Sequence, residues 1–448
     1  MNPIRTRFDF DFSSHPAQEA IRIINRLRRA GFTAYLAGGS VRDALLGKSP
    51  KDYDVATDAT PDAIRDVFGK NRTLAFGASF GVMGVLPDRR DAVAQKSTSQ
   101  KPASGEKDDA PQRNIKKIEP TEVATFRSDG VYLDGRRPDS VHFGNAAADA
   151  MRRDFTINGL FYDPSTSQII DYVGGREDLG RSLLRTIGDP RHRFAEDKLR
   201  MLRAVRFATT IGFQVESETA AAIREKAGEI IVVSGERIGV EMRRCMASEH
   251  VLSGLDYLDS LSLTHHVLPE LSHMDRQRVA RLFVKKRRRA FSTALATLLL
   301  ASKKPSADLA AITDRWKLSN EEVRIITAAV LAAPKLVIAH KLPWSKIQPI
   351  LIDRDVTFVL DVAIDLAAAD ELSHEGIERV QQALSQSKDQ LDPVPLLNGG
   401  DLAQLDIPAG PVYAEILRHL RQRQLDGELQ TREQAITEVR TRDWSREL

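Results

Sequence analysis

Two aspartates two residues apart, Asp52 and Asp54, lie in the segment KDYDVAT and could hold a divalent metal ion. If this segment is a strand, residues i and i+2 project from the same face, so both carboxylates point to one place. Magnesium suits such a pair, because it takes one or two carboxylates together with substrate phosphates and waters. An isolated Asp-x-Asp is more often a turn or a solvated edge, so the pair needs support from its surroundings.

A diglycine just upstream supplies that support. Gly38 and Gly39 end an apolar run, Phe32–Ala37, that is expected to form a strand, and they open a short helical segment. Glycine lets backbone N–H groups approach a ligand closely, and a helix N-terminus favours an anion. Arg42 could hold a phosphate, whereas Asp43 more often pairs with an arginine for structure. Together the two segments predict a phosphate site beside a metal-binding carboxylate pair.

Two further groups of side chains could complete this site. Glu122, in the expected strand Thr121–Phe126, becomes a third carboxylate if that strand lies beside the one with the two aspartates; otherwise it is a plain edge-strand glutamate. The adjacent Arg152 and Arg153 of RRDFTING could clamp a phosphate, with Asp154 as a structural carboxylate. An ordinary salt bridge on a helix is the alternative for these arginines.

A basic ridge is expected on a helix over Phe194–Phe207, FAEDKLRMLRAVRF. Four charged residues recur there at every third position: Asp197, Arg200, Arg203 and Arg206. At about 100° per residue each step drifts by about 60°, so the four wind round the helix with the first two side by side. A solvated, salt-bridged face is the alternative. Three arginines with one acid nevertheless carry an excess of positive charge, which suits a polyanion.

The first two members of this ridge could recognise a nucleobase. Cytosine and adenine both present an amine donor beside a ring-nitrogen acceptor, and uracil and guanine present the reverse. Asp197 as acceptor and Arg200 as donor complement the first pair. Against the second pair, each unsatisfied polar group costs about 1–3 kcal/mol, enough for strong discrimination. The remaining arginines would then serve a triphosphate.

Composition limits the class of protein. A chain of 448 residues with 42% hydrophobic and 28% charged residues is long enough for two to four soluble domains. The net charge of +3 is small, so a polyanionic partner must be met by local basic clusters. The single Cys245 excludes an intramolecular disulfide and is expected in the core. No secretory h-region or membrane-length apolar run occurs, which predicts a cytoplasmic protein without a membrane span.

Local patterns place the elements that must carry these residues. Residues up to Pro16 are expected to be frayed, and 127–143 to be a loop. Strands with glycine breaks are expected over Thr73–Leu86. Residues 88–119 lack aromatic side chains and are expected to form a flexible surface insertion. Helices are expected over Ala17–Arg29, Val41–Leu46, Thr60–Phe68, Ala146–Leu160, Ser234–Met246 and Ala294–Leu300 and over most of the chain beyond Glu216. The basic run Val284–Phe291 could contact a phosphate backbone or simply be solvated.

Five segments in a fixed order resemble the class II tRNA nucleotidyltransferases, the family of bacterial CCA-adding enzymes and poly(A) polymerases. They are LAGGSVRDALLGKSPKDYDVAT, TEVATFRSDGVYLDGRRP, RRDFTING, GDPRHRFAEDKLRMLRAVRFA and SGERIGVEM. The resemblance covers about residues 32–213, with a weaker echo over 395–435. It implies an α+β fold: a small mixed-sheet nucleotidyltransferase head over 1–160, a helical neck with a nucleotide-reading helix over 161–250, and an RNA-binding helical body and tail over 251–448.

The resemblance also implies roles for the candidate residues. Asp52 and Asp54 would be catalytic and hold a two-ion magnesium site, with Glu122 as a further catalytic carboxylate. The nucleotide contacts would come from Gly38, Gly39, Arg42, Arg152, Arg153, Asp197, Arg200, Arg203 and Arg206. A loop with Tyr132, Arg136 and Arg137 resembles the flexible loop associated with adding the terminal A.

The implied activity is template-independent addition of C and A residues, as CCA, to the 3′ end of tRNA from CTP and ATP, with release of pyrophosphate. A poly(A) polymerase, an enzyme adding only C or only A, and an inactive RNA-binding protein on the same scaffold are the alternatives. Leu300 and Ala301 stand where some relatives carry the His-Asp pair of a phosphohydrolase, so that second activity is not expected. Asn158-Gly159 stands where the family that this sequence resembles commonly has Asn-Ala.

Overall fold

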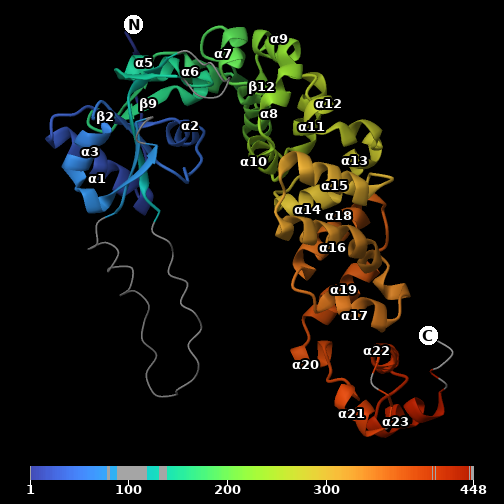
Figure 1. Ribbon diagram of the computed structural model, residues 1–448. Coiled ribbons are helices and arrows are strands. Elements are labelled where there is room, and N and C mark those ends of the chain that lie inside the picture. Colours follow the sequence, from blue (N-terminus) through green and yellow to red (C-terminus); the bar gives the residue numbers. More distant parts are fainter. Residues whose placement is uncertain are drawn as a thin grey trace, which may run out of the picture. The chain divides into compact units, whose positions relative to one another are not determined.

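The computed structural model describes residues 2–77, 81–87, 119–130, 139–405, 407–408, 410–442 and 444 (Figure 1). The chain divides into two compact units. The head unit comprises Met1–Val233 and Asp259–Leu263, and the helical unit comprises Ser234–Leu258 and Thr264–Leu448. No helix within the described ranges is both long and apolar enough to cross a membrane.

A mixed sheet forms the centre of the head unit. Its described strands run in the order β1-β10-β9-β2-β3-β6-β5-β4. Neighbouring strands are antiparallel except β3 and β6, which are parallel. The strands are β1 (Ile4–Arg7), β2 (Ala34–Ala37), β3 (Asp54–Thr57), β4 (Thr73–Gly77), β5 (Val82–Val85), β6 (Thr121–Thr125), β9 (Leu160–Asp163) and β10 (Gln168–Asp171).

Helices α1 (His15–Arg29) and α3 (Pro61–Phe68) pack together against this sheet (Figure 1). The apolar side chains Ile23, Ile24 and Leu27 of α1 are buried, as their helical spacing predicts. The Ser14 hydroxyl accepts from Ala17 N and caps α1, and the Thr60 hydroxyl accepts from Ala63 N and caps α3. A second cluster, with Phe126 and Phe161 at its centre, takes in α5 (Ala146–Met151). The packed helices thereby support the strands that carry the candidate site.

The other elements of the head unit are short. A two-stranded sheet pairs β7 (Arg127–Asp129) with β8 (Val141–Phe143), and another pairs β11 (Leu183–Leu184) with β12 (Gln214–Val215). The remaining helices are α2 (Gly39–Leu45), η1 (Lys70–Arg72), η3 (Thr156–Asn158), α6 (Gly175–Gly180), α7 (Pro190–Glu196), α8 (Leu199–Ile211), α9 (Ser217–Lys226) and η4 (Ala227–Val232).

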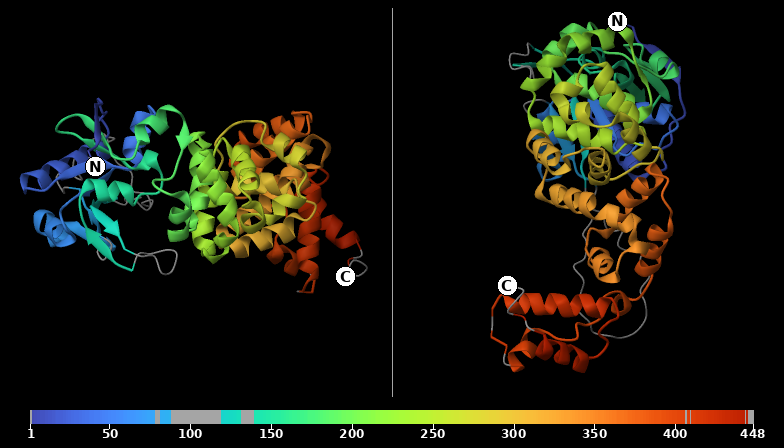
Figure 2. Two further views of the ribbon diagram at one scale, coloured as in Figure 1. Left: turned by 90° about the horizontal axis from the view of Figure 1, so that it is seen from above. Right: turned by 90° about the vertical axis from the view of Figure 1, so that its right-hand side faces the viewer.

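The helical unit contains no strand in the part of it that the structure describes. Its main core lies between α14, α16 and α18, while α21, α22 and α23 gather round a separate apolar cluster (red in Figure 2). Its helices are α10 (Gly235–Met246), α11 (Val251–Ser260), α12 (Thr264–Val267), η5 (Pro269–His273), α13 (Arg276–Leu282), α14 (Phe291–Leu299), α15 (Pro305–Trp316), α16 (Asn320–Val337), η6 (Ala339–Lys341), α17 (Trp344–Leu351), α18 (Val356–Ala369), α19 (Glu375–Leu384), α20 (Lys388–Leu391), α21 (Gly399–Gln404), α22 (Val412–Leu425) and α23 (Arg432–Thr441).

The α+β fold class predicted from the sequence is confirmed, as are the strands at Phe32–Ala37 and Thr121–Phe126 and the capped helix after Thr60. Cys245 is buried, as expected. The insertion expected over 88–119 lies outside the described residues except for Glu119.

Three expectations about local structure are wrong. The N-terminal segment is not frayed, because β1 pairs with β10 across more than 150 intervening residues. Part of the expected loop over 127–143 is the β7–β8 ladder. The helix expected over Ala146–Leu160 ends at Met151, since Asp154 and Asn158 bond to local groups and favour turns. The sheet also continues past residue 160 through β9 and β10.

Candidate functional site

Strand pairing brings the diglycine and the aspartates together. Ala37, at the end of β2, is paired with Asp54, at the start of β3, so Gly38 and Gly39 lie beside the carboxylate pair. Gly38 has a φ of 67°, and a Cβ there would lie 2.8 Å from Nη1 of Arg153. Only glycine allows this backbone to pass so close to the guanidinium group. Gly39 begins α2, the helix that carries Arg42.

Asp52 and Asp54 are both exposed, while Tyr53 between them is 6% exposed. Only Asp54 belongs to β3, and Asp52 precedes the strand, so the expectation that one strand carries both aspartates is wrong. The two carboxylates are still close enough for their charges to repel one another. Strand β6 runs parallel to β3 with Val123 opposite Val55, which puts Glu122 next to Asp54. Glu122 therefore lies on the strand next to that of Asp54. This was the condition for Glu122 to be a third carboxylate of the site.

The pKa of Asp54 is raised to about 6. The largest cause is the removal of hydration by surrounding protein atoms, followed by repulsion from Glu122 and from Asp52, and Arg153 partly offsets these. The side chain still reaches solvent, so a ligand can approach it. Asp52, Asp54 and Glu122 thus bring negative charges close together with little compensation, and such a group favours binding of a divalent cation.

In the described ranges no three His, Cys, Asp or Glu side chains converge in a way that could hold a metal ion by themselves. Glu122 is thus adjacent to Asp54 without completing a protein-only metal site. Two carboxylates that depend on substrate phosphates and water for the remaining ligands match the coordination that magnesium prefers.

Arg152 and Arg153 share one buried partner, Asp149 of α5. Its carboxylate is 1% exposed and accepts from Nε of Arg152 at 2.8 Å and from Nη2 of Arg153 at 2.9 Å. Nη1 of Arg153 also donates to Asn158 O at 3.2 Å. Burial alone would raise the pKa of Asp149, but the positive charges and hydrogen bonds of Arg153 and Arg152 outweigh it and lower that pKa. The salt bridge that was the alternative for these arginines is therefore present. It also holds Arg153 with its guanidinium group next to Gly38.

Asn158 and Asp154 connect the diglycine turn to α8. Nη1 of Arg42 donates to Oδ1 of Asn158 at 2.7 Å, and Nδ2 of Asn158 donates to Oδ1 of Asp154 at 2.9 Å. The other Asp154 oxygen accepts from Nε of Arg203 at 2.9 Å. Burial alone would raise the pKa of Asp154, but Arg203 and these hydrogen bonds hold it well below its usual range. Asp154 was expected to be structural, whereas Asn158 was noted only as part of a motif and without a role.

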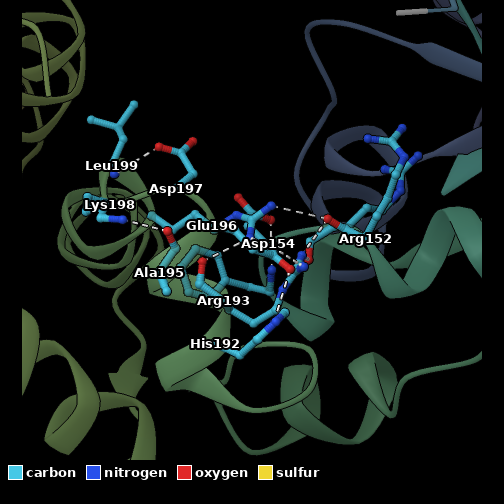
Figure 3. A network of polar contacts seen from close by, with 12 residues as sticks. Arg152, Asp154, His192, Arg193, Ala195, Glu196, Asp197, Lys198 and Leu199 are labelled. Atoms are coloured by element: carbon cyan, nitrogen blue, oxygen red, sulfur yellow. Dashed lines mark hydrogen bonds and ion pairs between the residues drawn. The ribbon is translucent and has the colours of Figure 1, made fainter. Parts of the chain in front are cut away.

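The expected single helix over 194–207 is wrong, because the chain breaks at Asp197. Helix α7 ends at Glu196, and Asp197 has the extended angles φ −144° and ψ 106°. Its Oδ1 accepts from Leu199 N at 3.1 Å, so the side chain caps the start of α8. Figure 3 shows this carboxylate turned toward Leu199, apart from the arginine network. Asp197 and Arg200 are therefore not neighbours on one helical ridge.

That network is centred on Glu196, which the sequence analysis missed. Glu196 pairs with Arg193 (Figure 3) and also with Arg200. Arg193 is 8% exposed and donates to the carbonyl oxygens of Arg152 and Arg153, each at 2.5 Å. The spacing of three and four residues about Glu196 was a usable signal, since such residues are neighbours on a helix.

The remaining candidates from the sequence are Arg206 and three loop residues. Arg206, on α8, is 8% exposed and stacks on Phe207. The loop residues Tyr132, Arg136 and Arg137 lie outside the described residues.

The basic run Val284–Phe291 is partly structural. Within it, Arg289 is 5% exposed and pairs with Asp365 at 2.7 Å, and Arg287 pairs with the same carboxylate. Lys285, Lys286 and Arg288 remain exposed. The run is therefore neither wholly solvated nor wholly available to a phosphate backbone.

Comparison with known proteins gives the family. Residues 34–185 match the poly A polymerase head domain, 212–274 match the RNA and SrmB-binding site of polymerase A, and 289–439 match tRNA nucleotidyltransferase domain 2. The chain is 30% identical over 427 residues to a CCA-adding enzyme of Streptococcus suis, covering 94% of this chain and 95% of that enzyme. It is 34% identical over 315 residues to one of Enterococcus faecalis, covering 70% of each.

Solved structures agree. The crystal structure of the Bacillus stearothermophilus CCA-adding enzyme in complex with CTP matches with a TM-score of 0.71 and 26% identity, over 96% of this chain and 98% of that one. A Thermotoga maritima CCA-adding enzyme complexed with tRNA shares the fold, with a TM-score of 0.60 over 94% of each chain. The chain therefore belongs to the class II tRNA nucleotidyltransferases, the family of CCA-adding enzymes and bacterial poly(A) polymerases.

Proposed function

We propose that this protein adds C, C and A to the 3′ end of tRNA from CTP and ATP without a nucleic-acid template and releases pyrophosphate. The observation that carries the proposal is the exposed Asp52–Asp54 pair placed by strand register beside the Gly38–Gly39 turn. The relatives named CCA-adding enzymes support it over nearly the whole chain. Transfer RNA, CTP and ATP are then its partners.

The reaction joins two substrates. The 3′-hydroxyl of the tRNA attacks the α-phosphorus of the nucleotide, the bond to the β-phosphate oxygen breaks, and pyrophosphate leaves. Magnesium ions held by Asp52 and Asp54 would lower the pKa of the hydroxyl and offset charge on the leaving oxygens. Two such ions are proposed, with Glu122 adding negative charge next to Asp54.

The arginines supply binding and orientation. Arg42 and Arg153 flank the diglycine turn and would take the phosphates, with Arg152 held beside them by the shared Asp149. Arg203 and Arg206 extend this positive charge along α8. Fixing the triphosphate in line with the attacking hydroxyl is a positioning contribution, which accounts for a large part of catalysis in phosphoryl transfer.

Choice of base is assigned to Asp197 and Arg200. In the structure Asp197 caps α8, and Arg200 is paired with Glu196 and donates to Arg193 O at 3.0 Å. A cytosine or adenine that approaches Asp197 and Arg200 therefore meets side chains that already have partners in the protein. Base selection is thus proposed to involve an exchange of partners at the junction of α7 and α8.

The test is an incorporation assay with tRNA lacking its last one, two or three nucleotides, magnesium, and labelled CTP, ATP, UTP or GTP. We expect C and A to be added up to a fixed length and U and G to be rejected. Asp52→Ala should abolish incorporation, because one of two metal-binding carboxylates is lost. Asp66→Ala, which alters an exposed aspartate of α3, should be active and serves as the control. Long A tracts on any RNA would instead identify a poly(A) polymerase.

A further inference from the structure

Three guanidinium groups surround the ring of Phe207, near the end of α8. The guanidinium carbon of Arg206 lies 3.7 Å from the ring centroid, that of Arg42 lies 5.2 Å from it, and that of Arg203 lies 5.4 Å from it. Arg42 comes from α2 and the other two from α8. One apolar side chain therefore joins the diglycine turn to the helix of the basic ridge.

The ring itself is held firmly. Phe207 is 6% exposed, and Phe155 packs against it edge to face, with centroids 5.7 Å apart and an interplanar angle of 77°. Phe155 is fully buried and directly precedes the turn that carries Asn158. The ring is thus fixed by the core on one side and faces charged groups on the other.

The ring of Phe207 reduces the repulsion between the three guanidinium groups. Guanidinium groups gathered in one place repel one another, and a carboxylate between them would remove the repulsion but also the positive charge. The face of a ring carries partial negative charge and attracts cations without neutralising them. Two of the three arginines also have a carboxylate partner, since Asp43 pairs with Arg42 and Asp154 pairs with Arg203. The ring attracts all three arginines without adding a further negative charge.

We propose that Phe207 is a positioning residue for nucleotide binding: it holds Arg42, Arg203 and Arg206 in one cluster for the triphosphate and adds no negative charge of its own. This inference rests on the proposed function, since it concerns the same nucleotide. It predicts that the phosphate contacts from α2 and from α8 are formed together. The two nucleotides share their phosphates, so the effect must be equal for CTP and ATP.

A purely structural role would have a different signature. If Phe207 only fills space, any apolar side chain of similar volume serves, and its loss lowers stability rather than nucleotide affinity. Phe207→Leu keeps an apolar side chain and removes the ring face, whereas Phe207→Tyr keeps the ring face. Phe68→Leu makes the same change at another buried ring, which lies under Arg26 away from the diglycine turn, and is the matched control.

The experiment measures steady-state KM and kcat for CTP and ATP, each with its matching tRNA, for these variants. Phe207→Leu should raise KM about tenfold for both nucleotides with little change in kcat, the scale of one or two lost cation–π contacts. Phe207→Tyr should restore most of the affinity. A ring-fluorinated phenylalanine at 207, which keeps the shape and weakens the ring face, should resemble leucine. Phe68→Leu should lower the melting temperature and leave KM near that of the wild type.

Equal KM values for the leucine, tyrosine and fluorinated variants, or a KM change confined to one nucleotide, would overturn the proposal. Calorimetric titration of CTP and ATP into the tRNA-free protein with magnesium separates this outcome from failure of the proposed function. If the wild type transfers no C or A, the proposed function fails. The role of Phe207 is then tested by whether the leucine and fluorinated variants bind nucleotide more weakly than the wild type and the tyrosine variant do.

Discussion

Replacing Asp54 with asparagine should stabilise the metal-free protein, although it should destroy activity. The folded protein raises the pKa of Asp54 to about 6 through lost hydration and repulsion from Glu122 and Asp52. Between pH about 4 and about 6 the folded state therefore binds more protons than the unfolded chain. The free energy of unfolding falls as the pH rises through this window and stays lowered above it. Asp54→Asn removes the charge that causes the loss.

The size of the effect follows from the pKa. A rise of about two pKa units is equivalent to about 3 kcal/mol at most. The Asp54 side chain is more than a third exposed, so solvent screens much of the repulsion, and we expect a gain of about 1 kcal/mol. For a unit the size of the head this raises the melting temperature by about 2–4 °C.

The assay is thermal unfolding of wild type and Asp54→Asn in EDTA at several pH values. The gain should be full at pH 7.5 and shrink as the pH falls toward 4, where both states bind the proton. Asp66→Asn, on the exposed side of α3, controls for a general change in charge. Added magnesium with CTP should raise the melting temperature of the wild type by more than that of Asp54→Asn. A lower melting temperature for the variant at pH 7.5, or an equal gain at every pH, would refute the reasoning.

Two further substitutions test other parts of the head. Asp197→Ala should lower the ratio of C and A incorporation to U and G incorporation while magnesium binding is retained; unchanged selectivity would remove Asp197 from base choice. Asp149→Ala should lower the free energy of unfolding by about 3–5 kcal/mol, because Arg152 and Arg153 lose a shared buried partner. Urea unfolding measures this loss, and a change below about 1 kcal/mol would show that water compensates for the carboxylate.

The sequence was sufficient where the signal is local. Thr60-Pro61 predicts the start of α3 because a hydroxyl cap and a first-turn proline act within one helical turn. The turn between β2 and α2 is predicted by its two glycines. The carboxylate pair was identified because its two residues lie close together in the chain. These features fix the centre of the candidate site.

Pairings between distant residues carried no such signal. Strand β1 has no turn that links it to β10, so nothing in the first sixteen residues marks it as a strand. The break at Asp197 arises because an aspartate can bond to a backbone N–H two residues ahead and compete with the helix. The partner of Arg203 is 49 residues away, and periodicity within one helix could not reveal it.

The contacts of these arginines bear on how a nucleotide is bound. Arg42, Arg153 and Arg203 each donate to a carboxylate or a carbonyl oxygen of the protein before any nucleotide arrives. A triphosphate therefore exchanges partners with them rather than meeting solvated side chains, and the net gain per contact is modest. In return, the guanidinium groups lose little conformational entropy on binding, because they are already ordered. Specificity then depends on which groups regain partners after the exchange, and a nucleotide that leaves Glu196 or Asp197 unpaired is disfavoured even when its phosphates fit.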